Sequence, residues 1–238
     1  ERSGTSVGSP GNNYHAWNPL KVGATSPGRG EQVSLEWTLE RIKRAGFIAI
    51  LRGKEPTELV QRGVDLAAAG ARVIEVTLDS TDASWVFQML RGQLDDDVLM
   101  GVGTVMHAES ALPSAADWGA QFALSPVQPE GMVDLAHDLG VLAVPGAATA
   151  NELWDAHLSG AMLVKLYPAV TSWSPAMLAG IPDPMRQVNT LPTGGITADD
   201  VEQWLDAGAF ACGLGSSLTI QDTDLLSSRM LERRGVLR

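Results

Sequence analysis

Strand-like and helix-like segments alternate eight times along this chain, and this alternation limits the possible folds more than any other feature. Strands are expected at 47–51, 72–78, 98–102, 121–124, 141–144, 162–167, 188–191 and 210–214. Helices are expected at approximately 57–69, 82–92, 108–118, 129–139, 150–159, 174–179, 198–207 and from 216 onward. Repeated strand–helix units are typical of an α/β protein with a parallel sheet. Eight of them predict a (β/α)8 TIM barrel, and an open doubly wound sheet is the alternative.

Glycine signals mark where several of these helices end. Three-residue sequences with a central glycine stand at 69–71, 118–120, 159–161 and 207–209, each directly before an expected strand. Glycine is favoured there because the residue after a helix often takes a left-handed backbone conformation. A further amphipathic helix precedes the first strand, with Ser34 as its expected N-cap.

The first 33 residues differ from the rest of the chain. They are rich in Gly, Ser, Pro and Asn and have neither a helical nor a strand period, which predicts an irregular arm. We therefore divide the chain into an arm at 1–33 and a barrel domain at 34–238. The arm is expected to lie against a neighbouring subunit or a different protein, through Tyr14, Trp17 and Leu20.

Composition excludes several classes of partner. A formal net charge of −11 with scattered basic residues argues against nucleic acid. No run approaches the ~20 apolar residues of a membrane-spanning helix, and the four histidines are too far apart in sequence for a predicted metal site. The single cysteine fits a reducing compartment. We expect a soluble intracellular protein, either cytoplasmic or in a plastid or mitochondrial matrix after removal of a targeting peptide, and not a secreted one.

Three charged residues stand in or directly after strands that are otherwise apolar. Lys165 interrupts the run "LVKLYPAV", Glu75 interrupts "RVIEVTL", and Arg52 follows the first strand. Strand alternation places all three on the inner face of a barrel, near the carboxyl ends of strands where such folds hold their active sites. A structural ion pair is the alternative explanation for any one of them. The convergence of three favours a functional site.

Two glycine-rich turns add a second signal. "PTGGI" at 192–196 follows the seventh strand, and "GLGSS" at 213–217 follows the eighth and is expected to open a helix. Barrels often bind phosphate between these two loops through backbone N–H groups. Glycine permits the close approach of the backbone to the phosphate oxygens.

The motifs "IAILRG", "VIEVTL", "GVGTV", "LSP", "VPGAAT", "VKLYPA", "PTGGI" and "GLGSSL" together resemble the KDPG/KHG aldolase family. The resemblance spans about Phe47 to Leu218 and implies a class I aldolase acting on a 2-keto-3-deoxy sugar acid. It implies that Lys165 forms the Schiff base and that Glu75 is the general acid/base. It further implies substrate contacts by Arg52, Thr104, Pro126 and Thr193, and a phosphate cradle of Gly194, Gly195, Gly215 and Ser216.

The resemblance also implies what the protein binds and how it assembles. The expected activity is cleavage of a 2-keto-3-deoxy (phospho)sugar acid or 4-hydroxy-2-oxoglutarate to pyruvate and an aldehyde. A covalent lysine imine does the chemistry, so no metal or organic cofactor is expected, and the family forms homotrimers. Asp79 and Val170 depart from residues usual in the phosphogluconate branch. The alternative is an aldolase-like barrel with little activity that serves as a structural subunit of a larger assembly.

Overall fold

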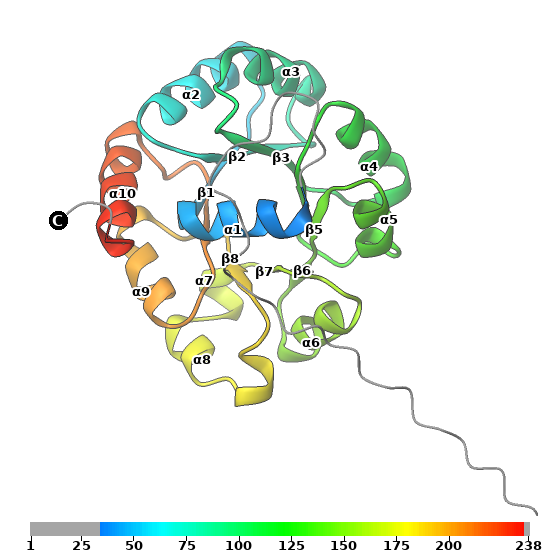
Figure 1. Cartoon of the computed structure of the whole chain (residues 1–238), viewed down its shortest axis with the longest axis vertical. Coiled ribbons are helices and arrows are strands. Elements are labelled where there is room, and N and C mark those ends of the chain that lie inside the picture. The colour runs from blue at the N-terminus through cyan, green and yellow to red at the C-terminus, as the bar shows by residue number, and fades with distance from the viewer. Residues whose placement is uncertain (1–33, 236–238) are drawn as a thin grey trace, which may run out of the picture.

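The computed structural model describes residues 34–235, in which parallel strands are surrounded by helices (Figure 1). One sheet has six strands in the order β5-β4-β3-β2-β1-β9, and a second sheet has three strands in the order β6-β7-β8. The six-stranded sheet contains β1 (Phe47–Leu51), β2 (Val73–Thr77), β3 (Leu99–Gly103), β4 (Phe122–Leu124), β5 (Leu142–Val144) and β9 (Cys212–Leu214). The three-stranded sheet contains β6 (Gly146–Ala147), β7 (Val164–Leu166) and β8 (Thr190–Pro192).

Helices connect the strands and form an outer layer around them (Figure 1). They are α1 (Leu35–Ala45), α2 (Pro56–Ala68), α3 (Ala83–Gln93), α4 (Ala108–Asp117), α5 (Met132–Asp138), α6 (Ala150–Leu158), α7 (Ala169–Ser172), α8 (Pro175–Ala179), α9 (Val201–Asp206) and α10 (Ile220–Arg233). Short 3-10 helices lie at Asp183–Met185 and Ala198–Asp200. The chain is therefore an α/β protein with a curled parallel sheet.

The eight expected strands are all present, with boundaries shifted by at most two residues at either end. The fifth expected run differs because the chain continues past Pro145 into the short strand β6, which pairs with β7. Proline has no N–H to donate to a neighbouring strand, so the run divides at this residue. The final helix begins at Ile220 rather than 216, because Thr219 caps it and residues 215–218 form a turn.

The four glycine joints end helices as predicted. Gly70, Gly119, Gly160 and Gly208 all have φ between 87° and 104°, in the left-handed region. The next residue in each joint donates its N–H back into the last helical turn, as Ala71 does to Leu66 at 2.9 Å. These bonds satisfy carbonyl groups that the end of a helix would otherwise leave without a partner. Ser34 is also confirmed as an N-cap, with its side chain accepting from the N–H of Trp37 at 3.2 Å.

Alternation along the strands divides the buried residues into two clusters. The larger cluster lies between strands and outer helices and includes Val164 and Leu166. The smaller cluster lies on the other face of the strands and contains Ile48, Val73, Leu99, Phe122, Leu142, Leu163 and Leu191. Two residues of α1, Leu39 and Ile42, belong to this inner cluster. Helix α1 thus lies across the strands in Figure 1 and packs on their inner face.

The two sheets meet at both of their junctions. At one junction the chain passes directly from β5 through Pro145 into β6, and the Pro145 carbonyl accepts from the N–H of Lys165 at 2.8 Å. At the other junction Thr193 forms a parallel bridge with Gly213, and the N–H of Phe210 donates to the carbonyl of Thr190 at 2.9 Å. These contacts bring the strands that carry the functional candidates to a common interior.

The expectations for the arm at 1–33, including Tyr14, Trp17 and Leu20, lie outside the described residues. Within 34–235, no helix combines the length and apolar character needed to cross a bilayer. The same described range contains no cluster of His, Cys, Asp or Glu that could hold a metal ion.

The packing of α1 on the inner face predicts a large effect of shortening Ile42. This side chain is fully buried, so Ile42→Ala should lower the free energy of unfolding by about 2–5 kcal/mol through lost burial and a cavity. The matched change Ile220→Ala removes the same atoms from a side chain that is 53% exposed and should change stability by about 0.5 kcal/mol or less. Urea unfolding of both variants tests this packing, and equal losses would contradict it.

Candidate active site

Lys165 occupies the middle of β7 and is only 4% exposed. Its neighbours Val164 and Leu166 face the helices, and Leu163 belongs to the inner cluster. The side chain of Lys165 therefore lies on the inner face, as strand alternation predicted. Its Nζ lies 5.1 Å from the centre of the Tyr167 ring, which is on the same face of the chain. A primary amine is thus held inside the protein with an aromatic ring beside it.

Glu75 lies on β2 and is 1% exposed. Room for its carboxylate comes from β3, because a Cβ at Gly103 would lie only 1.5 Å from Glu75 Oε1. Neither carboxylate oxygen has a hydrogen-bond partner among the described residues. Buried polar atoms without a partner are rare and carry a desolvation cost, so this carboxyl group is a strong candidate for contact with a ligand.

Burial shifts the pKa values of these two groups in opposite directions. Desolvation raises the pKa of Glu75, and the nearby Lys165 opposes this rise. Desolvation lowers the pKa of Lys165, and Glu75 opposes that change. Both shifts favour the neutral form, so the amine keeps its lone pair at a lower pH than an exposed lysine and the carboxyl keeps its proton at a higher pH than an exposed glutamate. The pair can therefore supply a nucleophile and a proton carrier.

Arg52 directly follows β1 and contacts residues in the segments after β2 and β3. Its Nη1 pairs with Asp79 Oδ2 at 2.7 Å, and its Nη2 donates to Thr104 Oγ1 at 2.9 Å. The Arg52 side chain is 56% exposed, so the guanidinium lies at the mouth of the interior. Its charge lowers the pKa of both Glu75 and Lys165, which places all three groups within electrostatic reach.

Thr104 has an unusual backbone conformation for a threonine. Its φ is 60°, in the left-handed region that a β-branched residue rarely adopts. It follows β3 directly, and its hydroxyl oxygen accepts the hydrogen bond from Arg52. Strained conformations of this kind persist where the surrounding structure fixes them, and they gather at functional sites.

The two glycine turns lie at the same end of the strands as Glu75 and Lys165. Gly194 and Gly195 follow β8 with φ of 96° and 82°. Gly215 and Ser216 follow β9 in the turn before α10, so this turn does not open the helix as predicted. Thr193 is buried and donates its hydroxyl to the carbonyl of Leu191.

Pro126 follows β4 on the same end and completes the predicted set. Its carbonyl lies so close to Gly146 that a Cβ there would be 2.4 Å from it. Because the paired strands are parallel, the structure places Glu75 and Lys165 within strands and the other predicted site residues after the carboxyl ends of strands. Two further contributors were not predicted from the sequence. Tyr167 lies two residues after Lys165 on the same face of the chain, so strand alternation could have identified it. The role of Gly103 becomes visible only when the pairing of β2 with β3 is known.

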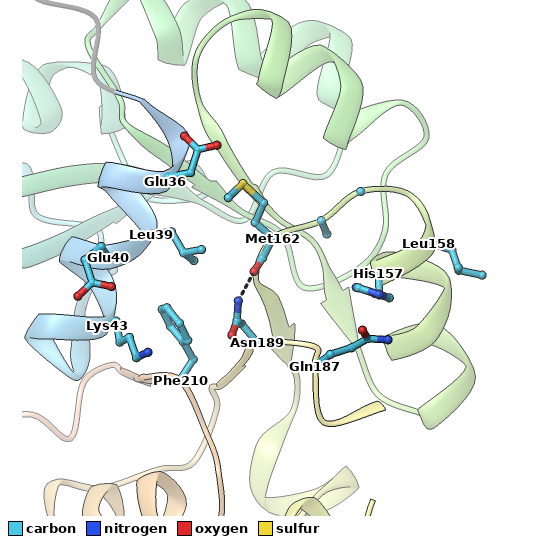
Figure 2. A pocket seen from close by; sticks show the side chains of 12 residues that line it. Glu36, Leu39, Glu40, Lys43, His157, Leu158, Met162, Gln187, Asn189 and Phe210 are labelled. Carbon is cyan, nitrogen blue, oxygen red and sulfur yellow. Dashed lines mark hydrogen bonds between the residues drawn. The ribbon is translucent and has the colours of Figure 1, made fainter. Parts of the chain in front are cut away.

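A hollow lies away from these residues, at the amino ends of β7, β8 and β9 (Figure 2). Its lining includes Leu39 and Lys43 of α1, together with Met162, Asn189 and Phe210, which precede the strands. Asn189 donates to the Met162 carbonyl at 2.9 Å across it. Neither Lys165 nor Glu75 contributes to this hollow, so the chemical groups described above belong to the opposite end.

A buried lysine and a buried glutamate on the inner face of a curled parallel sheet are the groups that a Schiff-base enzyme requires. A family model for "KDPG and KHG aldolase" matches residues 39–233. The chain belongs to this family, and the resemblance inferred from its motifs is confirmed.

Individual relatives agree with the family assignment. The chain is 31% identical to 2-dehydro-3-deoxy-6-phosphogalactonate aldolase of Escherichia coli K12, over 72% of this chain and 83% of that protein. It is also 31% identical to 2-dehydro-3-deoxy-phosphogluconate aldolase of Treponema pallidum, over 74% and 81% of the two chains. Members of this family are aldolases, and aldolases are lyases.

Solved structures show the same fold. A native KDPGal structure matches with a TM-score of 0.66 and 27% identity, covering 80% of this chain and 95% of that one. A KDPG aldolase from Legionella pneumophila, with pyruvate captured as a covalent carbinolamine intermediate, matches with a TM-score of 0.67 and 26% identity over 82% and 97% of the chains.

The space beneath Glu75 gives a test of this geometry. Gly103→Ala would place a methyl group against the buried carboxyl, so it should destabilise the protein by about 1–3 kcal/mol through overpacking. Gly92→Ala, in α3 with no atom within 4 Å of its added Cβ, should instead stabilise by about 0.5–1 kcal/mol. Urea unfolding measures both changes. A stabilising Gly103→Ala would show that Glu75 does not lie over β3.

Proposed function

We propose that this protein is a class I aldolase that cleaves a 2-keto-3-deoxy (phospho)sugar acid or 4-hydroxy-2-oxoglutarate to pyruvate and an aldehyde. The observation that carries the proposal is the buried Lys165, whose pKa is lowered by desolvation, coupled to a buried carboxyl with no hydrogen-bond partner among residues 34–235. Family membership supports it, as does the covalent pyruvate carbinolamine in the Legionella relative.

Lys165 is the proposed nucleophile. Its neutral amine attacks the C2 ketone to give a carbinolamine, which loses water to form an iminium ion. The positive iminium nitrogen accepts the electron pair of the C3–C4 bond when that bond breaks, and the C4 hydroxyl becomes the aldehyde. The enamine then takes a proton at C3, and water releases pyruvate from the lysine. The lysine imine serves as the electron sink in this scheme, so the proposed chemistry requires neither a metal nor an organic cofactor.

Glu75 is the proposed proton carrier. Carbinolamine dehydration requires protonation of the leaving hydroxyl, cleavage requires removal of the C4 hydroxyl proton, and the enamine requires protonation at C3. Desolvation holds the pKa of Glu75 above that of an exposed glutamate, which suits a group that must both give and take protons. Its two oxygens accept no hydrogen bond from the described residues, so they are available to the substrate.

The remaining site residues are proposed to hold the substrate. Arg52 and Thr104 supply a cation and a hydroxyl at the mouth, where they already contact each other. Pro126 and Thr193 are proposed to line the pocket for the pyruvate portion. Gly194, Gly195, Gly215 and Ser216 are proposed to receive the far end of the substrate, including a phosphate where one is present.

We infer that the two sheets belong to one closed (β/α)8 barrel, with residues 34–238 as the barrel domain and 1–33 as a separate arm. Support comes from the Thr193–Gly213 bridge at one junction and the direct passage through Pro145 at the other. The inner cluster fits a barrel interior, and α1 would close its amino end.

A homotrimer is the proposed assembly, on family grounds. A designed cage made "by fusing symmetric oligomeric domains" contains a chain that matches with a TM-score of 0.67 and 27% identity, over 80% of this chain. The arm is proposed to contact a neighbouring subunit or another protein. The alternative of an inactive structural subunit is less favoured, since both Lys165 and Glu75 are present and buried.

Trapping with borohydride tests the proposed nucleophile. Pyruvate with borohydride should add a reduced pyruvyl group to Lys165, located by peptide mass spectrometry. Trapping should persist well below the usual pKa of an exposed lysine, because burial keeps the amine neutral. Lys165→Met should abolish the adduct, whereas Lys54→Met, at a residue in the exposed loop after β1, should retain it. An adduct at another lysine, or none on the folded protein, would remove Lys165 from the role.

The proton-carrier role of Glu75 is tested by Glu75→Gln. The amide is similar in size but cannot exchange protons as a carboxyl does, so turnover should fall by ~10²-fold or more. Steady-state pyruvate release measures the change, with Glu109→Gln, an exposed residue of α4, as the matched control. Turnover equal to that of the wild type would exclude Glu75 from the mechanism.

A further inference from the structure

The mouth of the proposed active site carries an ion pair that the aldolase chemistry does not use. Asp79 follows β2 and pairs with Arg52 at 2.7 Å. The Asp79 and Arg52 side chains are 43% and 56% exposed, so both groups remain accessible to a substrate. Arg52 thus faces the mouth with its charge already balanced by a residue of the same chain.

Neighbouring contacts hold Asp79 in this position. The next residue, Ser80, is buried, and its Oγ lies 2.9 Å from Thr77 Oγ1. The same Ser80 oxygen accepts from the N–H of Gly53, and the N–H of Thr81 donates to the Gly53 carbonyl. These bonds tie the loop after β2 to the loop after β1. The pairing of Asp79 with Arg52 is therefore built into two connected loops.

The charges at the mouth consequently compensate one another. Arg52 is balanced by Asp79, and Lys165 is coupled to Glu75. The chain as a whole carries a formal net charge of −11, which adds a general repulsion toward highly charged anions. A substrate with both a carboxylate and a phosphate brings about two more negative charges than its unphosphorylated counterpart. The Asp79 carboxylate repels these additional charges.

One of the two glycine turns is partly covered by an apolar side chain. Val170 packs directly over Gly195, where an added Cβ would lie 2.3 Å from Val170 Cγ2. An apolar side chain thus covers part of the proposed phosphate-binding turn and would oppose the solvation of a phosphate there. At the other turn, Arg62 Nη2 donates to the carbonyl oxygens of Gly215 and Leu218, which ties α2 to the loop between β9 and α10.

We propose that Asp79 is a specificity-determining residue, which neutralises Arg52 and selects a 2-keto-3-deoxy acid whose far end carries hydroxyl groups instead of phosphate. A hydroxyl group along the substrate chain suits the pair chemically, because its oxygen accepts from Arg52 while its hydrogen donates to Asp79. This inference rests on the proposed aldolase function and narrows the substrate class of the same site.

The test compares phosphorylated and unphosphorylated substrates. Pyruvate release is measured from 2-keto-3-deoxygluconate, 2-keto-3-deoxygalactonate and their 6-phosphates, with wild type, Asp79→Asn, Asp79→Glu and the exposed control Asp117→Asn. Wild type should favour the unphosphorylated acid of at least one pair. Asp79→Asn should shift kcat/KM toward the phosphorylated acid by about tenfold or more, mainly through KM. Asp79→Glu and Asp117→Asn should behave like the wild type.

Two further measurements on Asp79→Asn distinguish the loss of a charge from a structural disturbance of the loop. The shift in Asp79→Asn should shrink as salt is raised, because the groups are exposed and screened. Asp79 raises the pKa of Lys165, so its removal should lower that pKa and move the acid limb of imine trapping to lower pH.

The outcomes distinguish this inference from the aldolase proposal. A wild-type preference for the phosphorylated acids in both pairs, or a selectivity within twofold of wild type in Asp79→Asn, would overturn the role of Asp79 while leaving the borohydride adduct at Lys165 intact. Loss of that adduct in the wild type would overturn the aldolase proposal and this inference together.

Discussion

The burial of an amine and a carboxyl within reach of each other is the constraint on which this structure depends. Charged groups are costly inside a protein, and Glu75 has no hydrogen bond from residues 34–235 to offset that cost. The pair responds by shifting both pKa values toward the neutral forms. Burying a lysine that can act as a nucleophile therefore lowers the stability of the folded protein. Apolar packing elsewhere must offset this desolvation cost.

The fold supplies this packing on both faces of the strands. Helices cover the outer face through the larger cluster, and α1 covers the inner face through Leu39 and Ile42. The same inner face carries apolar side chains such as Leu163 and the buried polar groups of Glu75 and Lys165. Gly103 leaves the space that Glu75 needs, and Gly213 does the same for Thr193. The same strands therefore supply both apolar packing and the groups proposed for chemistry.

Much of this arrangement could be predicted from the sequence, because alternation and glycine placement are local signals. The strands, the four glycine joints, the Ser34 cap and the inward faces of Lys165 and Glu75 follow from neighbours within a few residues. The division of the fifth run at Pro145, the later start of α10 and the space at Gly103 depend on which strands pair and how loops close. Such contacts join residues far apart in sequence, and local patterns do not report them.

The Arg52–Asp79 pair is a contact between distant residues that bears on the proposed function. Asp79 was visible in the sequence only as a departure from a family pattern, with no indication of its partner. The structure shows that Asp79 pairs with Arg52 at 2.7 Å. Lys165 and Glu75 stand on strands, where a change would disturb the packing of the sheet, whereas Asp79 and Val170 stand in the segments that follow strands. The same imine chemistry can therefore be kept while residues after the strands alter the charge and shape presented to the substrate.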